Sequence, residues 1–399
     1  MPIARAIPRH RITVCYPLAG DSLGGSHVSL LGLLCELDDG RYRKLVVPEF
    51  MGGKLSRHFA DYEQIADPAA PRESFAPGRS FGLLKAARTL SGLGRRVRFL
   101  RENAVDIVHT NDGRSHATWA LAAKLAGARL VWHHRGDPDA RGLRYVAPWL
   151  ADSIVTVSGF SLPRRRFGAA RRARVVYSPF DVSITADREL CRTRIVDDLA
   201  CSPESVICGF FGSFVERKRP LAFVEAIIQL RGRIDRPVIG VMFGEPKHEH
   251  MKVALDQRIG QPDVAGLVRL LGYRTPGHEW IAACDMLLVP AVNEPLGRTL
   301  VEAMLVRTPV IAADSGGNPE ALQDGCGVLV PPDNPEAMAE AIVRLLDQPD
   351  ARAAMIERAV MSAPLRFSGN SHGVAMEQVY SELVAAEAAR TADAPPGRP

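Results

Sequence analysis

Residues 286–330 read MLLVPAVNEPLGRTLVEAMLVRTPVIAADSGGNPEALQDGCGVLV, and the expected fold follows from this stretch. Its pattern predicts a buried strand at 286–289, then a helix at 296–305 with Pro295 at its first position, where a missing N–H costs nothing. A second strand at 309–312 ends in the glycine turn Gly316-Gly317, and another helix opens after it. The order strand, loop, helix brings a helix N-terminus to the end of a buried strand.

Two glutamates add chemistry to this helix N-terminus. Free backbone N–H groups and the helix dipole favour an anion such as a phosphate. Glu294 stands in the turn and Glu302 stands inside the helix, and carboxylates of this kind accept hydrogen bonds from the hydroxyls of a ribose or a sugar ring. An anion site beside two such carboxylates is suited to a nucleotide-sugar.

With seven residues between them, Glu294 and Glu302 resemble the E-x7-E motif of the retaining glycosyltransferases of family 4. The resemblance extends through VEAMLVRTPVIAADSGGNPEAL and GVLVPPDNPEAMAEAIVRLL. It implies the GT-B fold, an α/β architecture of two facing Rossmann-like domains with parallel sheets and a C-terminal helix that crosses back to the first domain. The resemblance is specific in the second half of the chain and diffuse in the first.

The length of 399 residues fits two domains. The expected boundaries are residues 1–185 for an N-terminal acceptor-binding domain, 186–365 for a nucleotide-sugar-binding domain, 366–390 for the returning helix and 391–399 for a disordered tail. A linker is expected within residues 181–204. Its seven cysteines are scattered without a C-x-x-C pair, which favours reduced thiols in a cytoplasmic protein and argues against a zinc site. The sequence has no apolar run of about 18 residues, so no membrane span is expected, and its first residues lack an apolar signal core, so no secretory signal is expected.

Charge is divided unevenly along the chain. Residues 1–180 carry 28 Lys and Arg against 15 Asp and Glu, a net charge of +13, whereas residues 181–399 carry 22 against 30, a net charge of −8. This asymmetry is either ordinary variation in surface charge or a sign that the first half meets an anionic membrane or acceptor. Within it, residues 81–101 mix apolar and basic positions, which suits either a membrane-surface helix or a core helix with an exposed basic face.

The first half contains a Rossmann-like opening and two strands that end in histidine. A strand at 11–16 runs into a loop with Gly24 and Gly25, which match the family's cleft loop but not the dinucleotide fingerprint G-x-G-x-x-G. His109 ends a predicted strand at 106–110, and His133, His134 and Arg135 follow a predicted strand at 130–132. In the family a histidine is often followed two residues later by arginine, which matches His133 and Arg135. Whether His134 has the functional role instead is left open.

In the second half, the residues that the resemblance assigns to the donor follow the predicted strands. Arg217 and Lys218 match the basic pair that grips the donor diphosphate, a task suited to one bidentate and one point-like cation. The remaining expected donor-binding positions are Gly212, Gly244, Tyr273, Arg274, Leu296, Gly297, Arg298 and Thr299.

The resemblance implies a hexosyl-type transferase that retains anomeric configuration and works in glycan, polysaccharide or glycolipid synthesis. Glu294 then holds donor-sugar hydroxyls, Glu302 holds the ribose, and His133, Arg217 and Lys218 complete the catalytic set, with no metal or other cofactor required. The expected partners are a nucleotide-sugar and a glycan, lipid-linked or acidic acceptor, at the inner face of a membrane, and no nucleic acid. A GT-B epimerase remains an alternative. So does a GDSL-type hydrolase using Ser22, although the D-x-x-H that would supply its base is absent near the C-terminus.

Overall fold

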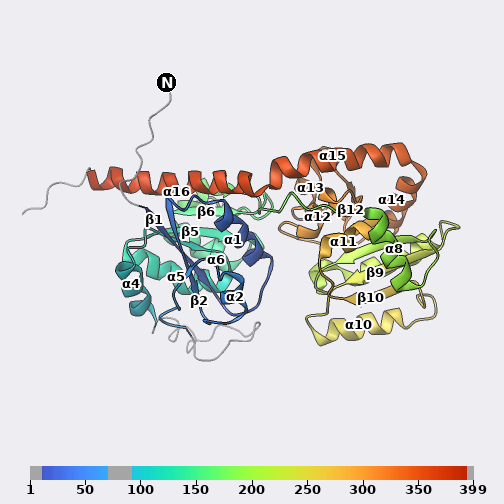
Figure 1. Ribbon diagram of the computed structural model, residues 1–399, viewed down its shortest axis with the longest axis horizontal. Helices are drawn as coiled ribbons and strands as arrows, with labels where there is room; N and C mark the ends of the chain where they lie inside the picture. Colours follow the sequence, from blue (N-terminus) through green and yellow to red (C-terminus); the bar gives the residue numbers. More distant parts are fainter. Residues whose placement is uncertain (1–10, 71–91, 393–399) are drawn as a thin grey trace, which may run out of the picture. The chain divides into compact units, whose positions relative to one another are not determined.

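The computed structural model describes residues 11–70 and 92–392, which divide into two compact units. The first unit takes residues 11–70, 92–157, 161–179 and 369–392, and the second takes 158–160 and 180–368. Each unit is an α/β domain built on one parallel sheet, as the sequence predicts (Figure 1). Each is described by itself below.

The first unit has a sheet in the order β3-β2-β1-β4-β5-β6-β7, with every pair parallel. Its elements are β1 (Ile12–Leu18), α1 (Gly25–Glu36), β2 (Tyr42–Pro48), α2 (Lys54–His58), β3 (Glu63–Gln64), α4 (Leu93–Glu102), β4 (Ile107–Thr110), α5 (Gly113–Ala126), β5 (Arg129–His134), α6 (Arg141–Tyr145), α7 (Ala147–Leu150), β6 (Ser153–Thr156), the 3₁₀ turn η1 (Gly168–Arg172), β7 (Arg174–Val175) and α16 (Gly369–Ala392).

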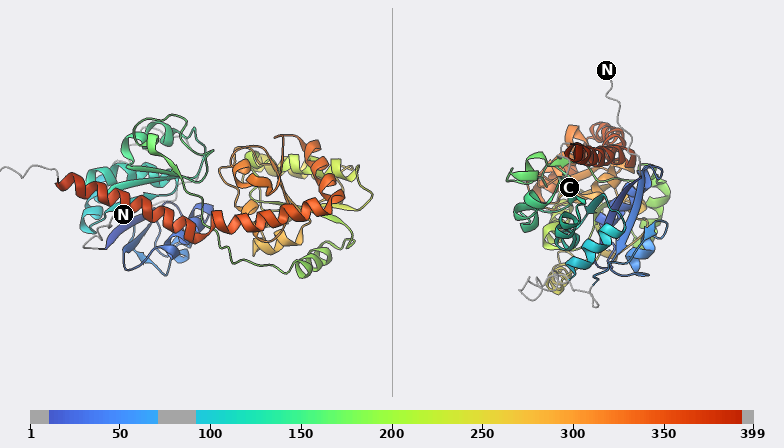
Figure 2. Two further views of the ribbon diagram at one scale, coloured as in Figure 1. Left: turned by 90° about the horizontal axis from the view of Figure 1, so that it is seen from above. Right: turned by 90° about the vertical axis from the view of Figure 1, so that its left-hand side faces the viewer.

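Alternate residues of these strands face two separate cores. Cys15 and Val108 belong to a core with α4 and α5, whereas Tyr16 and Ile107, their chain neighbours, belong to a core with α1 and α16. The views in Figure 2 show α16 lying across this unit, so this helix is the segment expected to return to the first domain. It extends to Ala392 and so includes the first two residues of the expected tail, and the rest of the tail lies outside the described residues.

The basic stretch expected at residues 81–101 is only partly described, because residues 81–91 lie outside the described ranges. The described part, α4, is a core helix. Its Arg96 is buried, donates to both carboxylate oxygens of Asp67 at 3.1 and 2.7 Å, and stacks over the Trp119 ring at 5.3 Å. Arg95 and Arg98 are exposed. Of the two interpretations that the sequence left open, the described part agrees with the second: α4 is a core helix with an exposed basic face.

The second unit has a sheet in the order β10-β9-β8-β11-β12-β13, again parallel throughout. Its elements are α8 (Arg188–Leu199), β8 (Val206–Phe211), η2 (Glu216–Lys218), α9 (Pro220–Arg231), β9 (Val238–Phe243), α10 (Glu249–Ile259), β10 (Val268–Gly272), α11 (Gly277–Ala283), β11 (Met286–Val289), α12 (Arg298–Leu305), β12 (Val310–Ala313), α13 (Asn318–Ala321), η3 (Gln323–Gly325), β13 (Val328–Val330), α14 (Pro335–Asp347) and α15 (Pro349–Phe367).

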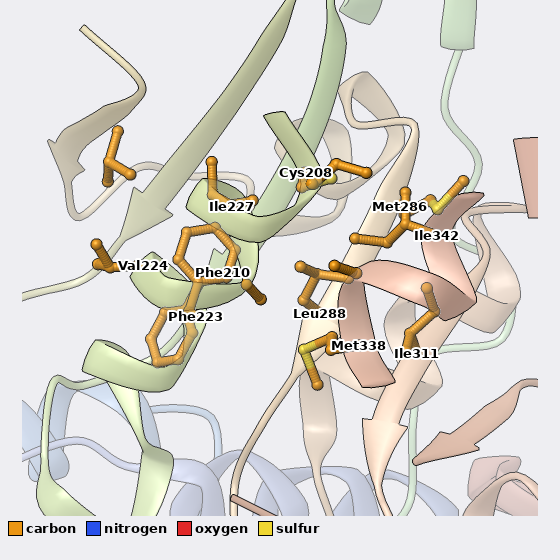
Figure 3. Packing of buried hydrophobic residues seen from close by; sticks show 14 of the residues in the cluster. Cys208, Phe210, Phe223, Val224, Ile227, Met286, Leu288, Ile311, Met338 and Ile342 are labelled. Carbon is orange, nitrogen blue, oxygen red and sulfur yellow. The ribbon is translucent and has the colours of Figure 1, made fainter. Parts of the chain in front are cut away.

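One face of this sheet carries a dense apolar core under α9 and α14. Figure 3 shows Phe223 and Ile227 of α9 near Phe210, and Met338 and Ile342 of α14 among the strand residues Met286, Leu288 and Ile311. Asn334 caps α14 as expected, since its side chain accepts from the Ala337 N–H at 2.9 Å. Burying such side chains fixes the sheet, and with it the loops at the strand ends.

The segment expected to be a linker, residues 181–204, is not one throughout. It contains α8, and Arg188 on this helix donates to Thr308 Oγ1 at 2.7 Å and to the Val306 and Cys284 carbonyls at 3.2 Å. A linker leaves its polar groups to solvent, whereas this helix is bonded to the domain that follows it. The prediction was wrong because a mostly polar helix lacks the apolar periodicity that identifies one.

Among the described residues, no helix combines the length and the apolar character needed to span a bilayer. All seven cysteines are free.

The buried Arg96–Asp67 pair provides a test of this fold. Replacing Arg96 by alanine leaves the Asp67 carboxylate buried without its cation, so we expect a loss of about 3–5 kcal/mol in the free energy of unfolding. Urea denaturation measures this change. The exposed neighbours serve as controls, and Arg95→Ala and Arg98→Ala are expected to change stability by less than about 0.5 kcal/mol. An Arg96→Ala variant as stable as these controls would contradict the core role of α4.

Candidate functional site

In the second unit, the residues expected to bind the donor gather at one edge of the sheet. Gly212 follows β8, Gly244 follows β9, and the loop with Glu294 follows β11. Parallel strands end at the same edge, which is where open α/β sheets place their ligands. The Gly244 N–H donates to the Gly272 carbonyl at 2.9 Å, and a side chain at Gly244 would lie 2.1 Å from the Gly212 carbonyl oxygen, so these loops pack backbone against backbone.

Three charged side chains form one cluster at this edge. The buried Glu294 carboxylate accepts from Arg217 Nη1, and Lys218 Nζ lies 3.0 Å from the same carboxylate oxygen. The Arg217 carbonyl also accepts from the Val292 N–H at 2.9 Å, which ties the η2 turn to the loop before Glu294. The sequence treated the basic pair and the glutamate as separate contacts to a ligand. The structure shows instead that their charges are coupled.

The turn after β12 packs against the backbone of the Glu294 loop and hydrogen-bonds to it. The Gly317 N–H donates to the Glu294 carbonyl at 2.7 Å, and a side-chain carbon at Gly316, where φ is +65°, would come within 2.6 Å of the Glu294 backbone. Buried Asn318 donates from Nδ2 to the carbonyls of Ala291 and Ala313, at 3.3 and 3.0 Å. Sequence reasoning predicted the two glycines only as a turn and missed Asn318, although all three lie within residues 286–330.

The helix that carries Glu302 starts later than expected. α12 begins at Arg298 with Gly297 as its N-cap, so the prediction of a helix from Leu296 with Pro295 at its first position was wrong. The chain between β11 and α12 remains irregular because it passes directly against the glycine turn. Leu296 and Gly297 are buried, and Thr299 is in the first turn of the helix.

Glu302 and Arg298 lie one helical turn apart, with Arg298 Nε 3.9 Å from Glu302 Oε1, and the Arg298 guanidinium covers the Phe180 ring at 4.2 Å. Burial raises the pKa of Glu302 above its usual value, and the charges of Arg298 and His278 oppose that shift. Burial also lowers the pKa of Arg298. Phe180 and His278 carry no motif that sequence reasoning could have used.

Two further positions expected at the donor site differ in their surroundings. Tyr273 is 79% exposed. Arg274 lies over the Trp280 ring at 5.1 Å and 3.6 Å from Asp198 of α8, so its guanidinium has partners within the unit.

In the first unit, the period-two alternation of strands separates the two neighbouring histidines. His109 and His133 share their parity with Ile107 and Val131, which belong to the core beneath α16. His134 points to the opposite face, where its Nε2 lies 2.8 Å from the Asp137 carbonyl oxygen. The structure therefore brings His109 and His133 together and excludes His134 from their group.

A buried chain of hydrogen bonds connects these histidines to α16. Tyr16 Oη lies 3.2 Å from Tyr380 Oη, which lies 2.5 Å from His109 Nδ1. His109 Nε2 lies 3.1 Å from His133 Nδ1, which is also 3.4 Å from Arg135 Nη2. Tyr380, which comes from a helix about 250 residues further along the chain, was missed by sequence reasoning because nothing local marks it.

The partners of this chain assign its tautomers. A guanidinium only donates, so His133 Nδ1 accepts from Arg135 and from His109, and His109 Nδ1 in turn accepts from Tyr380. Burial, reinforced by the Arg135 charge, lowers the pKa of both histidines well below the usual value, so each ring is neutral. Neutral His133 therefore carries its proton on Nε2, which has no hydrogen-bond partner among the described residues. It is a fixed donor.

Arg135 joins this group to the loop after β7. Its Nη1 donates to Ser178 Oγ at 3.0 Å, and its Nη2 lies 3.4 Å from Asn111 Oδ1. The Ser178 hydroxyl is therefore an acceptor for one N–H of this arginine. Next to it, His372 of α16 contacts the Tyr177 carbonyl through Nδ1 at 2.6 Å.

The start of α1 adds a third histidine with a defined tautomer. Gly24 is the N-cap of α1, Gly25 is its first residue, and the Gly24 N–H donates to His27 Nδ1 at 3.2 Å. His27 Nδ1 is therefore an acceptor, and burial lowers the pKa of this histidine, so its proton resides on Nε2. Nearby Ser22 is exposed, and no histidine of the described residues bonds to its hydroxyl, so the hydrolase alternative lacks its base.

Within the described residues, no group of three or more His, Cys, Asp or Glu side chains has the arrangement of a metal site.

Among the comparisons with known proteins, the match to a family model falls within the second unit. A family model for Glycosyl transferases group 1 matches residues 205–348. A D-inositol 3-phosphate glycosyltransferase of Catenulispora acidiphila is 31% identical over 200 residues, which are 47% of this chain and 46% of that protein. An alpha-D-kanosaminyltransferase of Streptomyces kanamyceticus is 27% identical over 220 residues, 54% of this chain and 55% of that protein. The chain thus spans about half the length of the curated relatives that it matches.

Solved structures match almost the whole chain. HepE of Anabaena, crystallised with UDP and glucose, superposes with a TM-score of 0.78 at 21% identity, covering 93% of this chain and 100% of that one. This likeness concerns the fold, and it confirms the GT-B fold that the sequence predicts.

The direction of the hydrogen-bond chain predicts unequal effects of its two tyrosines. Tyr380→Phe removes the donor to His109 Nδ1, so we expect the ¹⁵N resonance of that nitrogen to shift, while Arg135 keeps His133 in its Nε2–H tautomer. Tyr16→Phe removes only a donor to Tyr380 and should leave that resonance unchanged. Imidazole ¹⁵N chemical shifts in the two variants measure the difference. Equal effects of the two substitutions would show that the proton order assigned here is wrong.

The raised pKa of Glu302 predicts a pH-dependent effect on stability. A carboxyl whose pKa is raised by folding stabilises the protein in its protonated form and loses that contribution as pH rises through the folded pKa. Glu302→Gln should therefore raise the melting temperature near neutral pH, and this gain should disappear below about pH 4, where the unfolded carboxyl is protonated too. Calorimetry across this range measures it. Glu336→Gln, at an exposed carboxyl, is the control and should show no gain at neutral pH.

Proposed function

We propose, from the premise that this chain belongs through residues 205–348 to the group 1 glycosyl transferases, that it moves a sugar from a nucleotide-diphosphate-sugar to an acceptor hydroxyl. The observation that carries the proposal is the cluster of Glu294, Arg217 and Lys218 at the strand ends. Glu302 lies within α12, the helix that follows the Glu294 loop. Support comes from relatives named as glycosyltransferases and from a structural neighbour that was crystallised with UDP and glucose.

In this proposal the second unit binds the donor through opposite charges. The diphosphate lies against Arg217 and Lys218 and near the start of α12, where positive groups stabilise the charge that develops as the sugar leaves. The Glu294 carboxylate then gives up its ion pairs with Arg217 and Lys218 and accepts hydrogen bonds from the sugar hydroxyls. Glu302, beside Arg298, accepts from the ribose hydroxyls. The two side-chain cations supply the charge that a divalent metal would otherwise supply, so we propose that transfer needs no metal.

We further propose a hexosyl donor and retention of configuration, with the acceptor oxygen attacking on the face that the diphosphate leaves. Retention on one face requires donors that orient the sugar without attacking it. His133, held as an Nε2–H donor, is suited to this because burial keeps its ring neutral and its Nδ1 already accepts from Arg135 and His109. The basic first unit favours an acidic or lipid-linked acceptor in glycan, polysaccharide or glycolipid synthesis.

The coupled charges give a prediction that separates binding from catalysis. Lys218→Ala should weaken the binding of a nucleoside diphosphate by about 1.5–3 kcal/mol, the range for hydrogen bonds to charged groups. Glu294→Gln removes the anion that competes for the same cations, so it should preserve or tighten that binding while lowering turnover of the nucleotide-sugar. Titration calorimetry with UDP, GDP and ADP, followed by turnover of the matching nucleotide-sugars with and without chelator, measures both effects.

The control for this experiment is Arg219→Gln. Arg219 lies in the same loop, but its guanidinium pairs with Asp333 at 2.6 Å, so binding should not change. If Glu294→Gln and Lys218→Ala weaken diphosphate binding equally, the proposed competition is wrong. Conversion of a nucleotide-sugar to a new nucleotide-sugar without any acceptor would identify an epimerase instead. Loss of turnover in chelator would contradict transfer without a metal.

A further inference from the structure

An exposed aromatic surface lies on the first unit, away from the hydrogen-bonded histidines. Trp149 is 72% exposed, Tyr145 is 55% exposed and Val146 is 40% exposed, all within α6 and α7 and the residue that joins them. The Phe167 ring meets the Trp149 ring edge to face at 5.7 Å. A tryptophan in a soluble fold is highly buried on average, so this degree of exposure calls for an explanation.

Exposed arginines lie in the same two segments of the chain as these aromatic side chains. The segment after β6 is locked onto α7, because Gly168 packs so tightly that a side-chain carbon there would lie 2.2 Å from the Pro148 carbonyl oxygen. This contact holds Phe167 and its neighbours against α7. The exposed arginines of the two segments are Arg141, Arg164, Arg165, Arg166, Arg171 and Arg172.

Most of this positive charge is not neutralised within the protein. Arg164 pairs with Asp139 at 3.2 Å, and Arg174, further along, pairs with Glu382. No carboxylate of the described residues pairs with Arg165, Arg166, Arg171 or Arg172. We call this set, the four aromatic or apolar side chains with the arginines of residues 164–166 and 171–172, the aromatic–arginine surface.

We propose that the aromatic–arginine surface docks on an anionic lipid bilayer. The sequence left residues 81–101 open as a membrane-surface helix or a core helix, and the described part of that stretch buries Arg96 and leaves no exposed aromatic side chain. Trp and Tyr favour the boundary between headgroups and hydrocarbon, and arginines attract the anionic headgroups. The proposal rests on the proposed function in one respect, since a bilayer would carry a lipid-linked acceptor.

Charge and shape favour a bilayer over other anionic partners. A nucleic acid or an acidic peptide would be satisfied by the arginines and gives no reason for Val146 and Trp149 to be exposed together. A bilayer uses both components, because apolar side chains enter the interface while the cations meet the headgroups. Each exposed arginine near an anionic surface should strengthen binding by about fivefold at low salt, and salt should weaken it.

The tryptophans of the chain allow a direct test. Trp119, Trp132 and Trp280 are each 2% exposed, whereas Trp149 is exposed, so a change of intrinsic fluorescence on binding reports mainly Trp149. The full chain is mixed with phosphatidylcholine vesicles with and without phosphatidylglycerol, at low and high salt. We expect sedimentation with the anionic vesicles at low salt only, together with a blue shift of emission and quenching by brominated lipid.

Two variants and two matched controls locate the surface. Trp149→Ser should abolish the blue shift and reduce binding about tenfold, and Arg165→Gln with Arg166→Gln should reduce it about 25-fold, following the effect per charge. Met361→Ser, at a side chain that is 71% exposed in the second unit, should change nothing, and neither should Arg231→Gln with Arg269→Gln, at two exposed arginines of the same unit. Absence of binding to anionic vesicles at low salt, or binding without a Trp149 signal, overturns the proposal, as does a preference for RNA or an acidic peptide.

The same samples keep this proposal separate from the proposed function. Nucleoside diphosphate binding is measured on wild type and on Trp149→Ser, and both should bind equally. Vesicle binding without any nucleotide binding would overturn the proposed function and leave the surface standing. Nucleotide binding without vesicle binding would do the reverse.

Discussion

The second unit depends on a carboxylate buried between two cations. Glu294 is mostly removed from solvent, and a buried charge is tolerated only with partners. Arg217 and Lys218 supply them from the turn after β8, which is the neighbouring strand of β11. Strand order, loop conformation and charge therefore specify one another, since neither the turn nor the Glu294 loop satisfies its charges alone.

Small residues and backbone hydrogen bonds allow the turn after β12 to pack closely against the Glu294 loop. Gly316 and Gly317 let the turn after β12 pass directly under the Glu294 backbone, and Asn318 binds carbonyls from both loops. A side chain at either glycine would push the carboxylate away from its cations. The same constraint delays the start of α12 to Arg298, so the position of Glu302 on its helix is also a consequence of it.

The first unit contains a buried polar group made of neutral histidines instead of paired charges. His109 and His133 are buried beside the Arg135 cation, and burial with that charge keeps them uncharged. Neutral imidazoles have two possible tautomers, and only a partner with a fixed direction chooses between them. Arg135 at one end provides that direction, and the Tyr380 hydroxyl at the other end donates to the nitrogen that is left as an acceptor. A helix from the end of the chain thus completes a polar group built on β4 and β5.

The amino-acid sequence by itself determined the two parallel α/β units, most of their strands and the side chains that meet at the strand ends. Periodicity and turn residues are local, and the ends of parallel strands must share an edge. It did not determine that His133 rather than His134 joins His109, because the choice depends on which face α16 covers. Nor did it place Tyr380, Phe180 or the buried Arg96, whose partners lie far away in the chain. Only tertiary structure decides such contacts, since burial and pairing depend on distances in space that no local pattern records.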